Sequence, residues 1–271
     1  MELKITQVDA FTDQPFAGNP AAVCVTDQPL EDNLMQAIAA EMNLSETAFL
    51  HPLQDSPADG YSLRWFTPTT EVDLCGHATL ASAHTLWSEG HLPAEKPAKF
   101  KTKSGWLGAK QQKDWIELDF PVQPVEITQY VMPQLIKSLC CGGNIRVVAK
   151  NDVNYLIEVF SEQVLQNLRP DFVEMSKLPV QGVIVTAKAD SAAYDFVSRY
   201  FAPAVGVNED PVTGSAHTSL APYWQEKLGK STMTARQISA RGGVVRVTCE
   251  TSGRIAIGGQ AVTVLKGNLV I

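Results

Sequence analysis

The sequence predicts an α+β fold built from two similar domains, each with a small sheet wrapped around one central helix. Three observations predict it. Segments typical of strands occur in both halves of the chain, a short motif recurs about half a chain length later, and two helix-like segments carry no charged residue. At 271 residues the chain is long enough for two domains, each with its own core.

The first half of the chain is predicted to be mainly sheet. β-Branched and aromatic residues mark strands at residues 3–8, 21–25, 47–50 and 61–66, followed by hairpins over residues 99–120. Residues 31–42 instead place Leu34, Ile38 and Met42 at helical spacing, and Asn43 supplies a left-handed stop. We therefore expect one helix between the second and third strands.

Prolines at 121 and 124 favour a linker over residues 120–124, near the midpoint of the chain. Beyond it we expect at least two helices, strands at 144–148, 155–159, 180–186, 244–249 and 254–257, and a last strand at 261–266. The chain then divides into an N-terminal domain of residues 1–120 and a C-terminal domain of residues 121–260. We expect that the C-terminal strand, within residues 261–271, can return to the N-terminal domain.

An internal repeat indicates that one unit is duplicated. Residues 64–68 read RWFTP, and residues 199–203 read RYFAP, 135 positions later. Each motif is followed by a short loop, a Gly-x-Ala sequence and a helix, at CGHA (75–78) and TGSA (213–216), where the offset has grown to 138. A duplication with one three-residue insertion explains both offsets.

The two helices that follow the repeated motifs share an unusual composition. No Asp, Glu, Lys or Arg occurs from residue 78 to 88 or from 216 to 224. A helix without charge on any side is buried all round, and its many small residues allow strands to pack closely against it. Pro222 is expected to kink the second helix, which ends at Gly229.

Composition excludes several classes of protein. A formal charge of −7, with 45% hydrophobic and 19% charged residues, is typical of a soluble globular protein. The acidic balance, without a basic segment, argues against nucleic acid or an anionic membrane as partner. The sequence shows neither a signal peptide nor an apolar run of about 18 residues, and its five cysteines have no CxxC spacing. We expect a cytoplasmic protein.

The loop-to-helix junctions before the two uncharged helices are candidate binding sites. The first amide groups of a helix have no intrahelical partner, and the helix dipole attracts anions. Two such junctions facing each other across a domain cleft would hold a small carboxylate. In the alternative interpretation, Asp73 and Ser215 only cap their own helices.

Glu46 also allows two interpretations. Asn43 and Glu46 have the spacing of a capping box, but Pro52 leaves too little room for the helix that it would start, and Thr47 and Phe49 favour a strand. Glu46 then begins a strand, where its carboxylate can point into a cleft. The alternative is a solvated surface glutamate.

Other catalytic arrangements fit the spacing poorly. Asp210, Ser215 and His217 offer the residue types of a hydrolytic triad, but Ser215 and His217 would lie about 200° apart on a helix, and no GxSxG motif is present. Neither GxGxxG nor GxxxxGK[ST] occurs, so a nucleotide cofactor is not expected. No HExxH motif or second ligand cluster supports a metal site at the alternating residues Asp73, Cys75 and His77.

Several motifs occur together and in order over about the first 220 residues: VDAFT (8–12), FAGNP (16–20), SETAF (45–49), RWFTP (64–68), LCGHAT (74–79), FAP (201–203) and EDPVTGSA (209–216). In this combination the sequence strongly resembles the PhzF-like phenazine-biosynthesis family, which belongs to the diaminopimelate-epimerase superfamily. The resemblance implies two pseudo-symmetric α+β domains, each a mixed barrel-like sheet around a central helix, with the active site in the cleft between them. It further implies a homodimer that uses neither a metal nor an organic cofactor.

The resemblance also assigns residues. The SETAF glutamate matches Glu46, which is implied to be the catalytic acid and base, and His77 and Asp210 are implied to help orient the substrate and move protons. The implied substrate-binding residues are Cys75, Gly76, Thr213, Gly214 and Ser215.

The implied reaction is the isomerisation of a dihydro-hydroxyanthranilate, in which a proton leaves one ring carbon and returns at another. We expect a small carboxylated, amino-bearing substrate. Two alternatives remain: an amino-acid epimerase that uses Cys75, and a family member that binds a metabolite without catalysis. A two-thiol epimerase is disfavoured because the repeat places Thr213, whose hydroxyl is a very weak acid, opposite Cys75.

Overall fold

A computed structural model describes residues 2–53 and 60–271, which form two compact units. The first unit comprises Met1–Phe120 and Ala256–Ile271, and the second comprises Pro121–Ile255. The C-terminal strand β18 (Ala261–Val270) pairs with the N-terminal strand β1 (Glu2–Ala10) and so lies in the first unit. Among the described residues, no helix is long and apolar enough to cross a membrane.

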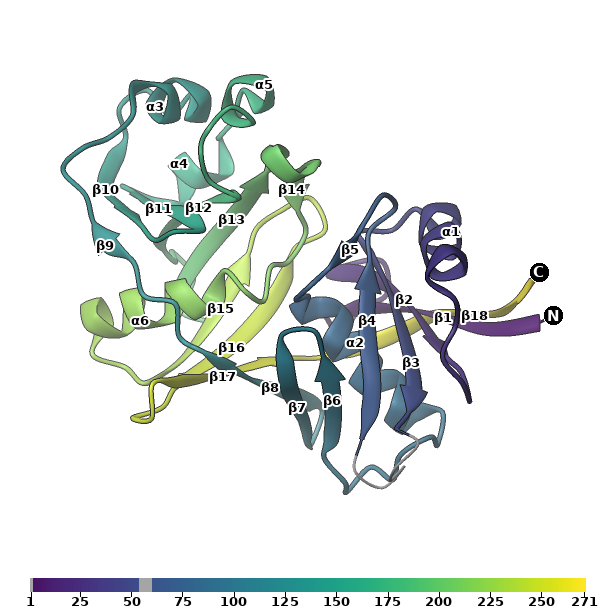
Figure 1. Ribbon diagram of the computed structural model, residues 1–271. Helices are drawn as coiled ribbons and strands as arrows, with labels where there is room; N and C mark the ends of the chain where they lie inside the picture. The colour runs from purple at the N-terminus through teal and green to yellow at the C-terminus, as the bar shows by residue number, and fades with distance from the viewer. Residues whose placement is uncertain (1, 54–59) are drawn as a thin grey trace. The chain divides into compact units, whose positions relative to one another are not determined.

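The first unit is a curved mixed sheet with one helix on each face (Figure 1). Its antiparallel pairs are β18–β1, β1–β2, β3–β4, β4–β5, β6–β7 and β7–β8, and its parallel pairs are β2–β3 and β4–β6. The strands are β1 (Glu2–Ala10), β2 (Asn19–Val25), β3 (Glu46–Pro52), β4 (Tyr61–Phe66), β5 (Glu71–Val72), β6 (Ala98–Thr102), β7 (Gly105–Gln112), β8 (Trp115–Pro121) and β18 (Ala261–Val270). The helices are α1 (Asp32–Met42) and α2 (Gly76–Ser88).

The uncharged helix α2 is buried along most of its length, as predicted, and packs against β1, β2, β3 and β18. Its polar side chains can be buried because their hydroxyls bond back to carbonyls of the preceding turn. Thr79, Ser82 and Thr85 donate to carbonyl oxygens four residues earlier, at 2.5, 2.7 and 2.9 Å. The predicted helix α1 covers the other face of the sheet through Met35 and Ile38, and it ends at Asn43 with φ of 50°.

The second unit repeats the topology of the first. Its antiparallel pairs are β9–β10, β10–β11, β12–β13, β13–β14 and β15–β16, and its parallel pairs are β11–β12 and β13–β15. The strands are β9 (Glu126–Ile127), β10 (Ile145–Lys150), β11 (Asn154–Val159), β12 (Gly182–Lys188), β13 (Phe196–Ala202), β14 (Val207–Asp210), β15 (Thr232–Gln237), β16 (Gly243–Cys249) and β17 (Arg254–Gly259), which continues into the first unit.

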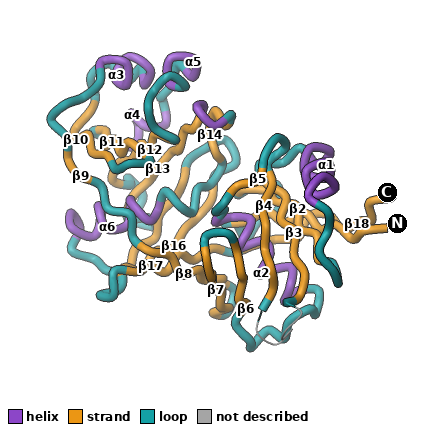
Figure 2. Tube along the Cα trace, viewed as in Figure 1, coloured by secondary structure: helices purple, strands orange, loops and turns teal. Residues whose placement is uncertain are grey.

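The helices of the second unit lie on both sides of its strands (Figure 2). They are α3 (Pro133–Leu139), α4 (Glu162–Gln166), α5 (Phe172–Met175), the short 3₁₀ turn η2 (Pro203–Val205) and α6 (His217–Leu228). Residues of α3, α4 and α5 share one core with β11, β12 and β13. On α6, Trp224 stacks on Phe196 and donates through Nε1 to the Thr186 hydroxyl.

The register of the two hairpins confirms the internal repeat and its insertion. Trp65 of β4 pairs with Val72, and Tyr200 of β13 pairs with Asp210. The first residues of these pairs are 135 positions apart and the second are 138 apart, as the sequence offsets require. The three extra residues therefore lie in the β13–β14 connection, where η2 forms.

Candidate active site

Glu46 is the first residue of β3, so the strand interpretation is correct and the capping-box interpretation is not. It pairs with Ala21 in the parallel ladder between β2 and β3. Its side chain is 18% exposed, which leaves the carboxylate partly open to solvent.

Cys75, Gly76 and His77 begin α2, with Cys75 at the N-cap position. No side chain caps this helix, and Asp73 is exposed, with its backbone carbonyl accepting from the Ser104 hydroxyl. The interpretation of Asp73 as a helix cap is therefore wrong. The thiol of Cys75 and the imidazole of His77 are both buried.

The His77 ring lies between three polar groups. Its Nε2 is 3.2 Å from Oε2 of Glu46, and its Nδ1 is 3.2 Å from Nδ2 of Asn19 and 3.5 Å from Sγ of Cys75. Burial lowers the pKa of His77 to about 3, so the ring is neutral at physiological pH. The first unit thus brings Glu46, Cys75 and His77 together, and their ligand-type atoms lie within 4.8 Å of one another.

Asn19 sets the tautomer of His77. The sequence alone had assigned no role to Asn19. The amide nitrogen of Asn19 is a donor, so Nδ1 of His77 accepts and the ring hydrogen is on Nε2. That hydrogen lies on the side of Glu46. The FAGNP motif contains Asn19, but only the fold shows that its amide meets the ring.

A strained loop delivers Asn19 to this position. Phe11, Phe16 and Gly18 have φ angles of 63°, 68° and 64°, and a Cβ on Gly18 would lie 2.2 Å from the carbonyl oxygen of Ala10. The backbone amide of Phe16 donates to the buried Asp9 carboxylate at 2.7 Å, which helps to hold the loop. Such strain persists only where the surroundings enforce it, and it concentrates at functional sites.

In the second unit, Asp210 and Thr213 form a fixed loop before α6. The Thr213 hydroxyl donates to Oδ2 of Asp210 at 2.5 Å. The fully buried Gln237 joins the two residues: its Oε1 accepts from the Thr213 amide at 3.0 Å, and its Nε2 donates to the Asp210 carbonyl at 2.8 Å and to the Thr213 hydroxyl at 3.2 Å. Sequence reasoning missed Gln237, because a lone glutamine at a strand end carries no recognisable pattern.

Gly214 and Ser215 complete this loop, and neither caps α6, whose N-cap position is Ala216. The interpretation of Ser215 as a helix cap is therefore wrong as well. His217 donates through Nδ1 to the Thr213 carbonyl at 2.8 Å and is fully buried. Nδ1 of His217 thus bonds to the Thr213 carbonyl, whereas a triad would require it to bond to the Asp210 carboxylate. The predicted cleft would combine residues of both units, and it stays a prediction.

The two units differ at the position of Glu46. In the β11–β12 ladder Gly182 pairs with Asn154, as Glu46 pairs with Ala21 in the β2–β3 ladder. A Cβ on Gly182 would lie 2.2 Å from the hydroxyl of Tyr200, which donates to Oδ1 of Asn154 at 3.1 Å. Burial and the charge of Asp210 raise the pKa of this hydroxyl. The carboxylate of the first unit thus has no counterpart at the matching place in the second.

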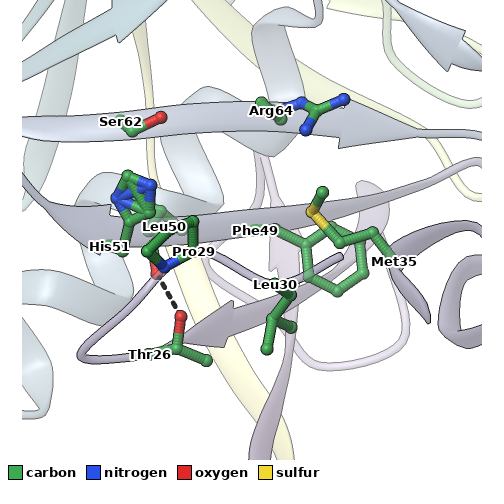
Figure 3. Close-up of a pocket in the computed structure, with 9 residues that line it drawn as sticks. All are labelled: Thr26, Pro29, Leu30, Met35, Phe49, Leu50, His51, Ser62 and Arg64. Carbon is green, nitrogen blue, oxygen red and sulfur yellow. Dashed lines mark hydrogen bonds between the residues drawn. The ribbon is translucent and has the colours of Figure 1, made fainter. Parts of the chain in front are cut away.

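A small cavity elsewhere in the first unit is lined by residues such as Met35, Phe49, His51 and Arg64 (Figure 3). Its volume of about 40 Å³ is close to the space of a single water molecule. Figure 3 also shows the Thr26 hydroxyl donating to the Leu50 carbonyl at one side of it. The cavity is too small for an organic substrate.

Comparisons with known proteins agree with the motifs. A family model described as phenazine biosynthesis-like protein, PhzC-PhzF, matches residues 8–267. An uncharacterized isomerase of Halalkalibacterium halodurans is 54% identical over 271 residues, covering 100% of both chains. The crystal structure of a PhzF-family phenazine biosynthesis protein from Enterococcus faecalis superimposes with a TM-score of 0.93 at 40% identity, covering 100% of both chains. A probable proline racemase from Agrobacterium radiobacter shares the fold alone, with a TM-score of 0.62 at 11% identity and coverage of 99% and 92%.

Proposed function

Because this chain belongs to the PhzC-PhzF family of phenazine biosynthesis-like proteins, we propose that it is a cofactor-independent isomerase that moves a proton within a small carboxylated, amino-bearing substrate. Glu46 acts as the base that removes the proton and then as the acid that returns it. The substrate resembles a dihydro-hydroxyanthranilate.

The observation that carries this proposal is the pairing of a partly open carboxylate with a buried, neutral imidazole. Oε2 of Glu46 lies 3.2 Å from Nε2 of His77; the two atoms do not have hydrogen-bond geometry in this structure, but the distance is within the reach of a catalytic pair that aligns when substrate binds. The Asn19 amide fixes the ring so that Nε2 carries the hydrogen. Glu46 is then oriented on one side while its other oxygen can face a substrate.

One carboxylate is enough for this chemistry. A C–H bond beside an unsaturated system is acidified by delocalisation, and a positioned base contributes about 10²- to 10⁴-fold. When the proton returns at another carbon on the same face, the same residue serves as base and then as acid. The resulting enol, at the hydroxyl-bearing ring carbon, tautomerises to a ketone. The first backbone amides of α2, at Gly76 and His77, are suited to hold the substrate carboxylate.

Epimerisation is the second candidate, since the Cys75 thiol lies 3.5 Å from Nδ1 of His77. Inversion at carbon needs a second acid on the opposite face. The repeat matches Thr213 to Cys75, and the Thr213 hydroxyl already donates to Asp210. The position that the repeat matches to Glu46 is Gly182. The repeat therefore favours isomerisation by one carboxylate.

A deuterium-exchange assay tests the proposal. The protein is incubated in D₂O with trans-2,3-dihydro-3-hydroxyanthranilate or with diaminopimelate, and deuterium incorporation is followed by NMR. We expect exchange into the first compound, and Glu46→Gln should lower its rate at least about 10²-fold. Glu41→Gln, at an exposed position on α1, is the matched control and should exchange at the wild-type rate.

Each result of this assay is informative. Near-normal exchange in a folded Glu46→Gln protein would remove Glu46 from its role. Exchange into diaminopimelate alone, abolished by Cys75→Ser, would replace isomerisation by epimerisation. A protein that binds the first compound without exchanging any proton would be a binding protein rather than an enzyme.

A further inference from the structure

Three different metal-ligand donors converge in the first unit. They are the carboxylate of Glu46, the thiol of Cys75 and the imidazole of His77, and one donor atom from each lies within 4.8 Å of the other two. No motif in the sequence supported a metal site at Asp73, Cys75 and His77. In the structure Asp73 is exposed, and the carboxylate beside the thiol and the imidazole is that of Glu46. The cluster comes from two elements, the start of β3 and the start of α2.

The distance between the Glu46 carboxylate and the His77 ring fits one edge of a small tetrahedral cation site. With Zn–N and Zn–O bonds of about 2.0–2.2 Å and a Zn–S bond of about 2.3 Å, neighbouring ligand atoms of a tetrahedral site lie about 3.5 Å apart. Nε2 of His77 and Oε2 of Glu46 are 3.2 Å apart. Sγ of Cys75 lies 3.5 Å from Nδ1, the other ring nitrogen, and within 4.8 Å of a Glu46 carboxylate oxygen, so the thiol has to move closer for one cation to be bound by all three residues.

We propose that Glu46, Cys75 and His77 bind Zn²⁺ or another thiophilic divalent cation. Cys75 loses its thiol proton to the solvent on binding, so a thiolate and a carboxylate balance the two charges of the cation. Thiolate and imidazole ligands select Zn²⁺ or Cd²⁺ over Mg²⁺ and Ca²⁺. The 18% exposure of the Glu46 side chain gives the cation a route into the otherwise buried cluster.

Asn19 is placed to support the bound state. A metal-ligating histidine donates its other ring N–H to a nearby acceptor. When Nε2 of His77 binds the cation, Nδ1 carries the hydrogen, and the Asn19 side chain 3.2 Å away can turn its amide oxygen toward it. Three protein ligands leave the fourth position of a tetrahedral site to water.

Binding of the cation does not depend on the proposed isomerase activity, but its consequence does. A Glu46 carboxylate that is bound to Zn²⁺ cannot accept a proton from a substrate. Resting on the proposed function, we therefore expect Zn²⁺ to inhibit proton exchange, and a chelator to restore it.

Cation binding is measured directly on chelator-treated full-length protein. Cd²⁺ is titrated while the sulfur-to-cadmium charge-transfer absorption in the ultraviolet is recorded, and Zn²⁺ is titrated in competition with a chromophoric chelator. We expect one equivalent of each cation and a charge-transfer band. Cys75→Ser should lose the band and weaken Zn²⁺ binding at least about 10-fold, and Glu46→Gln should keep the band with binding weakened about 10-fold. Cys140→Ser, which changes an exposed thiol, is the matched control and should keep both.

Two outcomes overturn the site: a band of unchanged intensity in Cys75→Ser, or equal Zn²⁺ affinity in the wild type and in both cluster variants. Failure of the isomerase proposal is a separate result. A protein that shows the Cys75-dependent band but exchanges no proton in any compound keeps the cation site and loses the proposed activity. A protein that exchanges protons but shows no charge-transfer band and is insensitive to Zn²⁺ keeps the proposed activity and loses the cation site.

Discussion

His77 and His217 both lie in the first turns of buried helices, yet their rings carry the hydrogen on opposite nitrogens. Nδ1 of His77 accepts from Asn19, whereas Nδ1 of His217 donates to the Thr213 carbonyl. Burial lowers the pKa of His217 to about 4, so this ring too is neutral. The Nε2–H of His77 therefore lies on the side of Glu46. The Nδ1–H of His217 instead donates to the Thr213 carbonyl and helps to hold the Asp210–Thr213 loop.

Gln237 is predicted to position that loop. Replacing it by the similarly sized Leu leaves the Thr213 amide and the Asp210 carbonyl without their side-chain partner in a buried place, at a cost of about 1–3 kcal/mol in the free energy of unfolding. If Asp210 acts in the reaction, the exchange rate in Gln237→Leu should fall at least about 10-fold while the far-ultraviolet circular dichroism stays unchanged.

The matched control for this prediction is Gln111→Leu, at an exposed position on β7. The conservative variant Gln237→Glu keeps an acceptor for the Thr213 amide but loses the donor to Asp210, so its exchange rate should lie between those of Gln237→Leu and the wild type. A folded Gln237→Leu protein with the wild-type exchange rate would show that the hydrogen bonds of Gln237 do not position the Asp210–Thr213 loop for the reaction.

The residues of the candidate site were predictable from the sequence to different degrees. Glu46, Cys75 and His77 stand in motifs, and the strand start at Glu46 followed from Pro52, Thr47 and Phe49. The contacts of Asn19 and Gln237 were not predictable, because each depends on a side chain that is distant in the sequence: His77 is 58 residues from Asn19, and Thr213 is 24 residues from Gln237.

At the scale of the elements, each repeated hairpin is held by the same arginine–glutamate fork. Nε and Nη2 of Arg64 bond to Glu71 at 2.7 and 2.8 Å, and the same atoms of Arg199 bond to Glu209 at 2.7 and 2.8 Å. Each arginine also lies over the phenylalanine two residues later. Because Glu71 and Glu209 precede the loops of CGHA and TGSA, the forks fix where each loop leaves its strand.

The two forks are predicted to differ in strength. The Arg199 side chain is 11% exposed and also donates to the Leu165 and Leu168 carbonyls, so Arg199→Met should lower the free energy of unfolding by about 3–5 kcal/mol. The Arg64 side chain is 27% exposed, and Lys103 remains beside Glu71, so Arg64→Met should cost about 1 kcal/mol.

Urea unfolding followed by circular dichroism measures both costs of these arginine substitutions. The two variants are controls for each other, since they remove the same fork from equivalent hairpins. Equal destabilisation, or a larger cost in Arg64→Met, would contradict the ranking by burial.

The elements show where sequence patterns succeed. Strong alternation and β-branched residues predicted β1 to β4, the β6–β8 hairpins and most strands of the second half. The sequence did not identify β13 as a strand, nor β15, whose residues TMTARQ are largely polar. It also missed the short strands β5, β9 and β14 and the short helices α3, α4 and α5. The short helices are shaped by packing on the sheet of the second unit rather than by their own periodicity.

At the scale of the whole chain, the duplication continues into the connecting strands. β9 follows β8 and pairs with β10, the first long strand of the second unit. β18 follows β17 and pairs with β1, the first strand of the first unit. The C-terminal strand therefore occupies in the first unit the place that the two-residue β9 occupies in the second, and it brings the two ends of the chain side by side (Figure 1).

This arrangement predicts that the chain tolerates circular permutation. Glu2 pairs with Val270, so a linker of about four residues can join the ends as a hairpin. New ends are placed between Lys113 and Asp114, in the exposed turn that joins β7 to β8, because exposed turns tolerate new ends. We expect an unchanged far-ultraviolet circular dichroism spectrum and a thermal midpoint within about 5 °C of the wild type.

The control permutant carries the same linker but opens the chain between Ile184 and Val185, both fully buried in β12. Cutting there breaks a strand that pairs with β11 on one side and with β13 on the other, so this permutant should fail to fold. If the permutant opened at residues 113–114 also aggregates, the β1–β18 pairing depends on free chain ends. The prediction that the chain tolerates circular permutation is then wrong. If both permutants fold, β12 is less important to the second unit than its pairing indicates.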